Sequence, residues 1–359
     1  MVELGTSIYD YREIKISHNL IYSATTICDS HQATSLPDSS KPDIFFLVFD
    51  EYTNNETLNK LWHFQNDSIT YRLKREGFYI ASHTRANYDF TPYSISSMFN
   101  MDYLDPGKGN DATSGRNVLQ SNNSMSDNQL FCILKKENYS LQFHAPFSNS
   151  IEEDSLGHYF DYLPEGQLYR QTLPGSISLD IAWNFSKNRQ NDIFGRWKDL
   201  DRGAETLAKA NQKLIGLIKS STDSTSAREP HFVYGHFLIT HEPHLFDNQG
   251  KLHTEYLDGD LMKTYTTEIE YANIVINDLV TYILAHNKKN TILIVAGDHG
   301  FRKIPEKLNA FRFPNFTAIY FPDQDYKNLY QTISPVNMFR VVLNQYFFQH
   351  LPILADSSV

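Results

Sequence analysis

Short continuous apolar runs recur along the chain, separated by segments whose apolar residues have helical spacing. A continuous apolar run predicts a strand that is covered on both faces, as in a parallel sheet. The longest run, IFFLVF at 44–49, is far shorter than the roughly 20 residues that cross a bilayer as a helix. Six strands are predicted, at 43–50, 77–83, 139–144, 231–240, 291–297 and 316–322.

Helices are predicted between these strands. The clearest spans 262–286, where apolar residues line one side: Ile269, Ala272, Val275, Ile276, Leu279 and Ile283. Others are predicted at 55–62, 68–78, 94–100, 129–136, 203–219 and 335–345. Residues 105–127 are rich in Gly, Asn and Ser, which predicts a loop. Strands that alternate with helices predict an α/β three-layer sandwich with a mostly parallel central sheet.

Composition narrows the classes of function. A chain of 359 residues suits one large α/β domain or two medium ones. The formal charge of −10, with scattered Lys and Arg, excludes the basic footprint of a nucleic-acid-binding protein and a polybasic membrane patch. Two cysteines, Cys28 and Cys132, are too few for a disulfide framework or a thiolate metal cluster. The sequence does not decide whether these two cysteines form a single disulfide, so it does not decide the redox compartment either.

Polar residues with ligand or catalytic chemistry follow four of the predicted strands. Ligands of parallel sheets bind beyond the carboxyl ends of the strands, so these positions are candidates for a site. They are Asp50 and Glu51, Thr91, His241 and His244, and Asp298 and His299. Taken singly, each has a structural explanation, such as a turn aspartate, a helix-capping threonine or a surface histidine.

The combination points to a metal site. Carboxylate, imidazole and hydroxyl groups suit a divalent ion such as zinc or manganese. Such an ion lowers the pKa of a hydroxyl that it touches, which makes Thr91 a candidate nucleophile. A helix that starts near Thr91 also favours an anion there, such as a phosphate or a sulfate.

Four segments resemble the alkaline phosphatase superfamily in its sulfatase-like branch, which includes phosphoethanolamine transferases and lipoteichoic acid synthases. They are PDIFFLVFDEY (42–52), NYDFTPYSISSMFNMDYL (87–104), HFLITHEPHLFD (236–247) and VAGDHGFR (295–302). They occur in the order of the family, and the resemblance covers roughly residues 42–347. It implies an alkaline-phosphatase-like fold.

The resemblance implies a set of metal ligands. One divalent ion, zinc or manganese, would be held by Asp50, Thr91, Asp298 and His299. Glu51 is a rival of Asp50 because two acids stand side by side where related sequences vary.

The resemblance also implies residues that act on the substrate. His241 would bind phosphate oxygens or protonate the leaving alcohol, while His244 and Arg302 would bind the substrate. A second ion, as in the two-metal members of the superfamily, would be held with the help of His236 and His244.

Thr91 separates this chain from the sulfatases proper, which need a cysteine or serine that is oxidised to formylglycine. Threonine cannot give that aldehyde, and it matches the transferase branches instead. The resemblance therefore implies a metal-dependent phosphoryl hydrolase or transferase that acts on phosphodiesters of phosphoethanolamine or phosphoglycerol type through a covalent phosphothreonine. Two alternatives stay open: a sulfate ester hydrolase with an atypical nucleophile, and a binding module without catalysis.

The resemblance implies a location and a division of the chain. The substrate would be a phospholipid headgroup or a glycan-linked ester, and the domain would lie in the periplasm or cell envelope of a bacterium. The chain as given is expected to be soluble, with membrane association only through a segment outside it. Residues 1–41 would form a polar lead-in toward such an anchor, 42–350 a single sulfatase-like catalytic domain, and 351–359 a tail.

Overall fold

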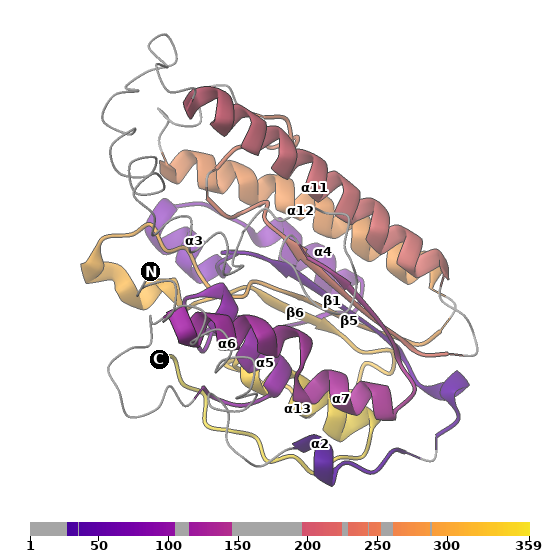
Figure 1. Cartoon of the computed structure of the whole chain (residues 1–359). Helices are drawn as coiled ribbons and strands as arrows, with labels where there is room; N and C mark the ends of the chain where they lie inside the picture. Colours follow the sequence, from indigo (N-terminus) through magenta and orange to yellow (C-terminus); the bar gives the residue numbers. More distant parts are fainter. Residues whose placement is uncertain are drawn as a thin grey trace, which may run out of the picture.

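The structure, a computed structural model, describes residues 27–34, 36–104, 115–145, 196–224, 229–242, 244–252, 261–287 and 289–359. Within these ranges six strands form one sheet that lies between two layers of helices (Figure 1). The predicted three-layer α/β sandwich is therefore confirmed. No helix in these ranges has both the length and the apolar character needed to cross a membrane.

The sheet contains all six predicted strands. Across the sheet they are β2 (Tyr79–Ile80), β6 (Thr317–Tyr320), β5 (Thr291–Ala296), β1 (Asp43–Phe49), β4 (His231–Phe237) and β3 (Ser140–His144). β1 pairs in parallel with both β4 and β5, and β3 pairs in parallel with β4. β6 is antiparallel to β5 and to β2, so it alone runs against the other described strands. The sheet is thus mostly parallel, as expected.

Each face of the sheet is covered by its own set of helices. One layer consists of α3 (Asn55–Trp62), α4 (Asp67–Arg75), α11 (Arg196–Ser224) and α12 (Leu261–His286). The other consists of α2 (Ile27–Ser30), α5 (Thr91–Asn100), α6 (Gly115–Ser126), α7 (Gln129–Lys136) and α13 (Pro335–Tyr346). Successive residues of β1 alternate between the two cores: Phe45 packs with the first layer and Phe46 with the second. This double coverage explains why β1 is apolar without interruption.

The helix α6 corrects the loop that composition predicts over 105–127. Residues 115–126 are helical, whereas 105–114 lie outside the described residues. Met125 is buried in the core beneath α5, and the hydroxyls of Ser96 and Ser124 hydrogen-bond to each other. Packing against α5 therefore outweighs the weak helix propensity of Gly, Asn and Ser.

The segment before β1 is fastened to α7. A disulfide joins Cys28 to Cys132, which settles the bridge that the sequence left open. The carboxylate of Glu137 is bonded to His31 Nε2 at 2.8 Å, to Thr34 Oγ1 at 2.7 Å and to Lys41 Nζ at 3.0 Å. The part of the lead-in from Ile27 onward therefore packs on the domain, while the predicted boundaries at 41 and 350 stay predictions.

Loss of this disulfide should lower the free energy of unfolding by about 3–4 kcal/mol, because the bridge closes a long loop of the unfolded chain. The two cysteines are 104 residues apart. Urea titration of the double variant Cys28→Ser/Cys132→Ser against the oxidised wild type measures the effect. Reducing agent should lower the stability of the wild type to that of the variant and leave the variant unchanged. A loss below about 1 kcal/mol would contradict the expectation.

The C-terminal residues bond to the segment just before α5. The Val359 N–H donates to the carbonyl oxygen of Asn87 at 2.8 Å, and Asn87 Nδ2 donates to the carbonyl oxygen of Ser357 at 2.8 Å. The backbone N–H of Val336, in α13, donates to Asn87 Oδ1 at 2.9 Å. Asn87 thereby ties the start of α5 to the C-terminal part of the chain.

Candidate active site

Four segments converge at the carboxyl end of the parallel strands. Because β1 lies between β4 and β5, residues that follow these three strands are neighbours in space. Asp50 follows β1, His241 follows β4, and Asp298 and His299 follow β5. Thr91, the first residue of α5, joins them and is 5% exposed.

The Thr91 hydroxyl belongs to a buried polar cluster. Its Oγ1 atom lies 3.2 Å from Asp50 Oδ2 and 3.2 Å from His299 Nε2. The same Nε2 atom lies 3.4 Å from Asp298 Oδ2 and 3.6 Å from Asp50 Oδ1. The four residues expected to hold an ion are all buried and are linked through these contacts. We refer to them as the ion cluster.

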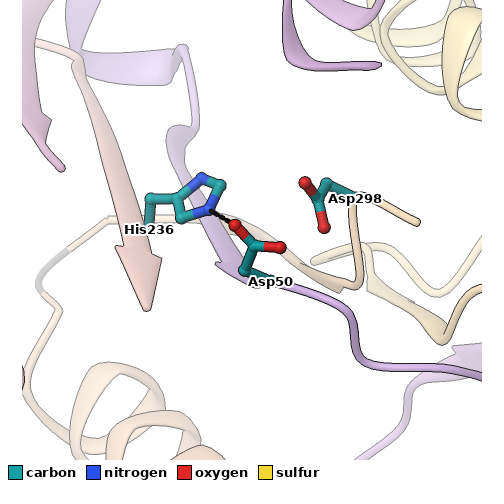
Figure 2. Close-up of side chains that lie close together, drawn as sticks. All are labelled: Asp50, His236 and Asp298. Atoms are coloured by element: carbon teal, nitrogen blue, oxygen red, sulfur yellow. Dashed lines mark hydrogen bonds and ion pairs between the residues drawn. The ribbon is translucent and has the colours of Figure 1, made fainter. Parts of the chain in front are cut away.

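The structure brings His236, in β4, to the same place. Its Nε2 atom lies 3.3 Å from Asp50 Oδ2, and its Nδ1 atom lies 2.6 Å from the hydroxyl of Tyr234. Figure 2 shows Asp50, His236 and Asp298 arriving from separate elements with their side chains directed toward one another. One potential ligand atom from each lies within 4.8 Å of the other two. His236 is therefore a neighbour of the ion cluster itself.

Buried negative charge makes this cluster suitable for a cation. Asp50 Oδ1 and Asp298 Oδ2 are buried and have no hydrogen-bond partner among the described residues. Adjacent buried carboxylates repel each other, and a divalent cation between them would remove that repulsion. Carboxylate, imidazole and hydroxyl groups are ligands that zinc and manganese accept. The residues present thus fit the divalent ion expected from the sequence.

Neighbouring histidines keep Asp50 ionised. Burial raises the pKa of this carboxyl, but positive charge on His241, the hydrogen bond from His236 and the charge on His299 outweigh burial. The pKa of Asp50 therefore lies well below its usual value. This residue is available as an anionic ligand over the ordinary pH range.

Close packing explains the glycines on either side of Asp298 and His299. A Cβ atom at Gly297 would lie 2.1 Å from the carbonyl oxygen of Tyr52, and one at Gly300 would lie 2.6 Å from that of Pro314. No side chain fits at either position without moving the backbone. The glycines allow the aspartate and histidine to follow a strand that is packed this tightly.

Glu51, Arg302 and His241 form a second group, the arginine group. Arg302 Nε donates to Glu51 Oε1 at 2.6 Å, and Arg302 Nη2 donates to His241 Nε2 at 2.9 Å. In the neutral ring, a lone pair on Nε2 accepts this second bond, and the proton on Nδ1 is donated to the carbonyl oxygen of Glu242 at 2.5 Å. Glu51 is thus engaged with the arginine, and this geometry favours Asp50 over Glu51 as a metal ligand.

Charge around His241 favours its protonated form. Burial lowers the pKa of the imidazole, but the carboxylates of Asp50 and Glu51 raise it by more, so the net pKa lies above its usual value. A proton on Nε2 would take the place of the hydrogen bond from Arg302. His241 can therefore hold either a proton or the arginine at that atom.

His244 has a different environment. Its Nδ1 atom lies 2.6 Å from Glu268 Oε2, and its ring stacks on that of Phe301 with 5.6 Å between centroids. Glu268, in α12, also accepts hydrogen bonds from the backbone N–H groups of Leu245 and Phe246. Burial lowers the pKa of His244 to about 4. These contacts fasten the loop after β4 to α12, and the substrate and second-ion roles of His244 stay predictions.

Sequence patterns miss two of these residues, Tyr234 and Glu268, and suggest His236 only for a second ion. A signal exists for Glu268, because it lies one helical turn before Ala272 on the apolar side of α12. A buried acid at such a position needs a partner. Tyr234 and His236 similarly interrupt a strand that is buried along its whole length.

Comparison with known proteins identifies the family. The profile of the family described as Sulfatase matches residues 70–342, which is most of the chain. The chain belongs to the sulfatase family. The predicted membership in the alkaline phosphatase superfamily is therefore confirmed. A search of curated proteins finds no match.

Solved structures share the fold of this sulfatase-family chain at low sequence identity. The C-terminal periplasmic domain of EcEptC from Escherichia coli, in complex with Zn, is 10% identical over 87% of this chain and 84% of that chain, with a TM-score of 0.50. The soluble domain of lipooligosaccharide phosphoethanolamine transferase A from Neisseria meningitidis is 12% identical over 87% and 89%, with a TM-score of 0.50. The integral membrane form of that transferase is 13% identical, with a TM-score of 0.51; 96% of this chain is covered, but only 61% of the membrane protein.

Proposed function

We propose that this domain is a metal-dependent phosphoryl hydrolase or transferase that acts on phosphodiesters through a covalent phosphothreonine on Thr91. The position of the Thr91 hydroxyl, 3.2 Å from both Asp50 and His299, carries the proposal. A threonine hydroxyl is a weak nucleophile unless a base or a cation activates it. A carboxylate and an imidazole within hydrogen-bonding range, in a cluster that suits a cation, supply those conditions.

Asp50, Thr91, Asp298 and His299 would hold one divalent ion, zinc or manganese, with His236 as a further potential ligand. Such an ion, when bound, lowers the pKa of a hydroxyl and stabilises negative charge on a phosphoryl oxygen. Burial of all five side chains excludes bulk water from the position where the hydroxyl must lose its proton.

The steps follow from the positions of the other residues. Thr91 Oγ1 gives its proton to Asp50 Oδ2, the acceptor 3.2 Å away, and attacks the phosphorus, and the bond between phosphorus and the leaving alcohol breaks. His241 gives a proton to the oxygen of that alcohol, in line with its raised pKa. Arg302 and the positive end of the α5 dipole stabilise the non-bridging oxygens. Water then cleaves the phosphothreonine in a hydrolase, whereas a second alcohol does so in a transferase.

We propose a phosphoethanolamine- or phosphoglycerol-type ester on a lipid headgroup or a glycan as the substrate. Support comes from the names of the structural neighbours, which include a periplasmic domain and a phosphoethanolamine transferase. The Cys28–Cys132 disulfide supports a location outside the cytoplasm, because disulfides persist in oxidising compartments. The proposed setting is therefore the bacterial cell envelope.

Sulfate ester hydrolysis is a second candidate, because the family match is to Sulfatase. The same geometry would let Thr91 take a sulfuryl group in place of a phosphoryl group. A binding module without catalysis is a weaker candidate, since the hydroxyl, both aspartates and His299 remain together in one buried cluster.

The test is a substrate panel followed by location of the covalent adduct. Aryl phosphodiesters and aryl sulfates are offered with zinc or manganese, and the protein is quenched in acid during turnover and digested. We expect turnover of the phosphodiesters and a phosphorylated peptide that contains Thr91, with neither in metal-depleted protein. Turnover of sulfates alone would favour the second candidate. Protein that binds no stoichiometric metal and gains no activity when metal is added would favour the binding module.

A further inference from the structure

Glu51 has a backbone conformation that few residues adopt. Its φ is 62°, in the left-handed region that non-glycine residues rarely enter. Its side chain is fully buried at the end of the central strand. Strain of this kind persists where surrounding contacts hold it, and it is often found at functional sites.

The contacts of Glu51 connect three parts of the site. Its backbone N–H donates to Asp298 Oδ1 at 3.1 Å, within the ion cluster. Its carbonyl oxygen accepts from the hydroxyl of Tyr265, in α12, at 2.6 Å. Its side chain accepts from Arg302 Nε at 2.6 Å. Both the conformation and the position of this carboxylate are therefore fixed.

The carboxylate fixes Arg302 in turn. Glu51 and His241 engage Nε and Nη2 of the guanidinium, and no residue in the described ranges bonds to Nη1. The arginine side chain is 24% exposed, whereas that of Glu51 is 0% exposed. Arg302 thus has N–H donors left for an anion that approaches from the solvent side, while the buried carboxylate of Glu51 holds the guanidinium in place.

Glu51 sets the net charge of the site. Asp50, Asp298 and Glu51 contribute three negative charges, against one positive charge each from Arg302 and protonated His241 and two from a bound divalent ion. The net charge is then +1, which an ester with a single negative charge neutralises, whereas without Glu51 it is +2, which suits an ester with two. Charge in a buried site has a large effect on such discrimination, because screening by water is weak there.

We propose that Glu51 is a positioning residue that holds Arg302 beside the ion cluster and, by its buried negative charge, makes the site prefer singly charged esters to doubly charged ones. This rests on the proposed function of the same site. Phosphodiesters carry one negative charge, whereas phosphate monoesters carry nearly two well above their second pKa of about 6. Glu51 would therefore select diesters over monoesters.

Equilibrium binding tests the proposal independently of turnover. The probes are phenylphosphonate, a dianion at pH 8.5, and its monomethyl ester, a monoanion of nearly the same shape. Both are titrated into manganese-loaded protein, and the ratio of the two dissociation constants is measured. We expect the wild type to prefer the monoanion and Glu51→Gln to shift the ratio about tenfold toward the dianion. A failure of Thr91 chemistry appears in the adduct experiment and leaves this ratio unaffected.

Further variants separate charge from position. Glu51→Asp keeps the charge but is too short to hold Arg302, so both probes should bind more weakly at an unchanged ratio. The pair Glu51→Gln/Arg302→Gln removes one charge of each sign and should return the ratio close to that of the wild type. Glu56→Gln removes an exposed carboxylate of the same kind and should change nothing.

Three results would overturn the proposal. The first is an unchanged ratio in Glu51→Gln at full manganese content. The second is loss of manganese from Glu51→Gln, which would make Glu51 a ligand. The third applies if Glu51→Gln does not fold, and it is a wild-type ratio in Arg302→Gln. The proposal expects the ratio of that variant to move toward the monoanion.

Discussion

Thr91→Ala should lower turnover of every phosphodiester that the wild type cleaves by at least about 10³-fold, because the covalent route is lost with the nucleophile. Among the described residues, no other hydroxyl makes side-chain contacts with both Asp50 and His299. No other described hydroxyl is therefore placed to take over the attack. Thr91→Ser keeps the hydroxyl and should retain a measurable part of the activity.

The control for this variant is folding. Loss of one hydroxyl should change the free energy of unfolding by only about 1 kcal/mol, so Thr91→Ala should melt close to the wild type. Thr70→Ala, which removes an exposed hydroxyl bonded only to Asp67 among the described residues, should keep full activity. Steady-state rates and thermal melts of the three proteins are compared. An alanine variant as active as the wild type would refute the role of Thr91.

Asp298→Asn should remove the stabilisation that a metal gives to the protein. Asp298 Oδ1 accepts from the backbone N–H groups of Glu51 and His299, and the amide oxygen of asparagine can do the same. Asp298 Oδ2 has no such partner in the described chain, and its replacement by an NH₂ group cannot bind a cation. The fold should thus survive while the ion site fails.

The measurement is unfolding with and without metal. A ligand at 100 times its dissociation constant adds about 2.7 kcal/mol to the stability of a protein that binds it only when folded. We expect a gain of this size for the wild type on adding manganese and none for Asp298→Asn, with kcat/KM reduced by at least about 10³-fold. Without metal the variant should be no less stable, since one of the crowded negative charges is gone. Asp325→Asn, at an exposed ion pair, should behave like the wild type, and a manganese gain that persists in Asp298→Asn would contradict the assignment.

The parts of the fold that could be predicted are those in which buried positions carry apolar residues. β1 and β5 lie in the middle of the sheet, so their sequences are apolar throughout and mark them as strands. The helix α6 could not be predicted, because packing against α5 stabilises it, whereas its own Gly-, Asn- and Ser-rich sequence has weak helix propensity. The run at 77–83 predicts a longer strand than the two residues of β2, since an apolar run does not reveal where pairing with β6 ends.

The site could be predicted where its residues stand at strand ends. Asp298 and His299 follow an apolar strand directly, so topology alone brings them to the edge of the sheet. The bond between Glu51 and Arg302 joins residues 251 positions apart. It depends on a left-handed backbone conformation at Glu51, which cannot be predicted from a glutamate in the sequence. Likewise, nothing in the motif around His244 indicates that its ring turns toward Glu268.

The bonds of Asn87 have a consequence for synthesis in the cell. Asn87 is fixed by Val336, Ser357 and Val359, all of which are translated long after Thr91. A nascent chain lacks these partners, so its α5 cannot yet be anchored in the mature position. We therefore expect α5 to reach its mature position only after residues 336–359 have been synthesised and have packed against Asn87.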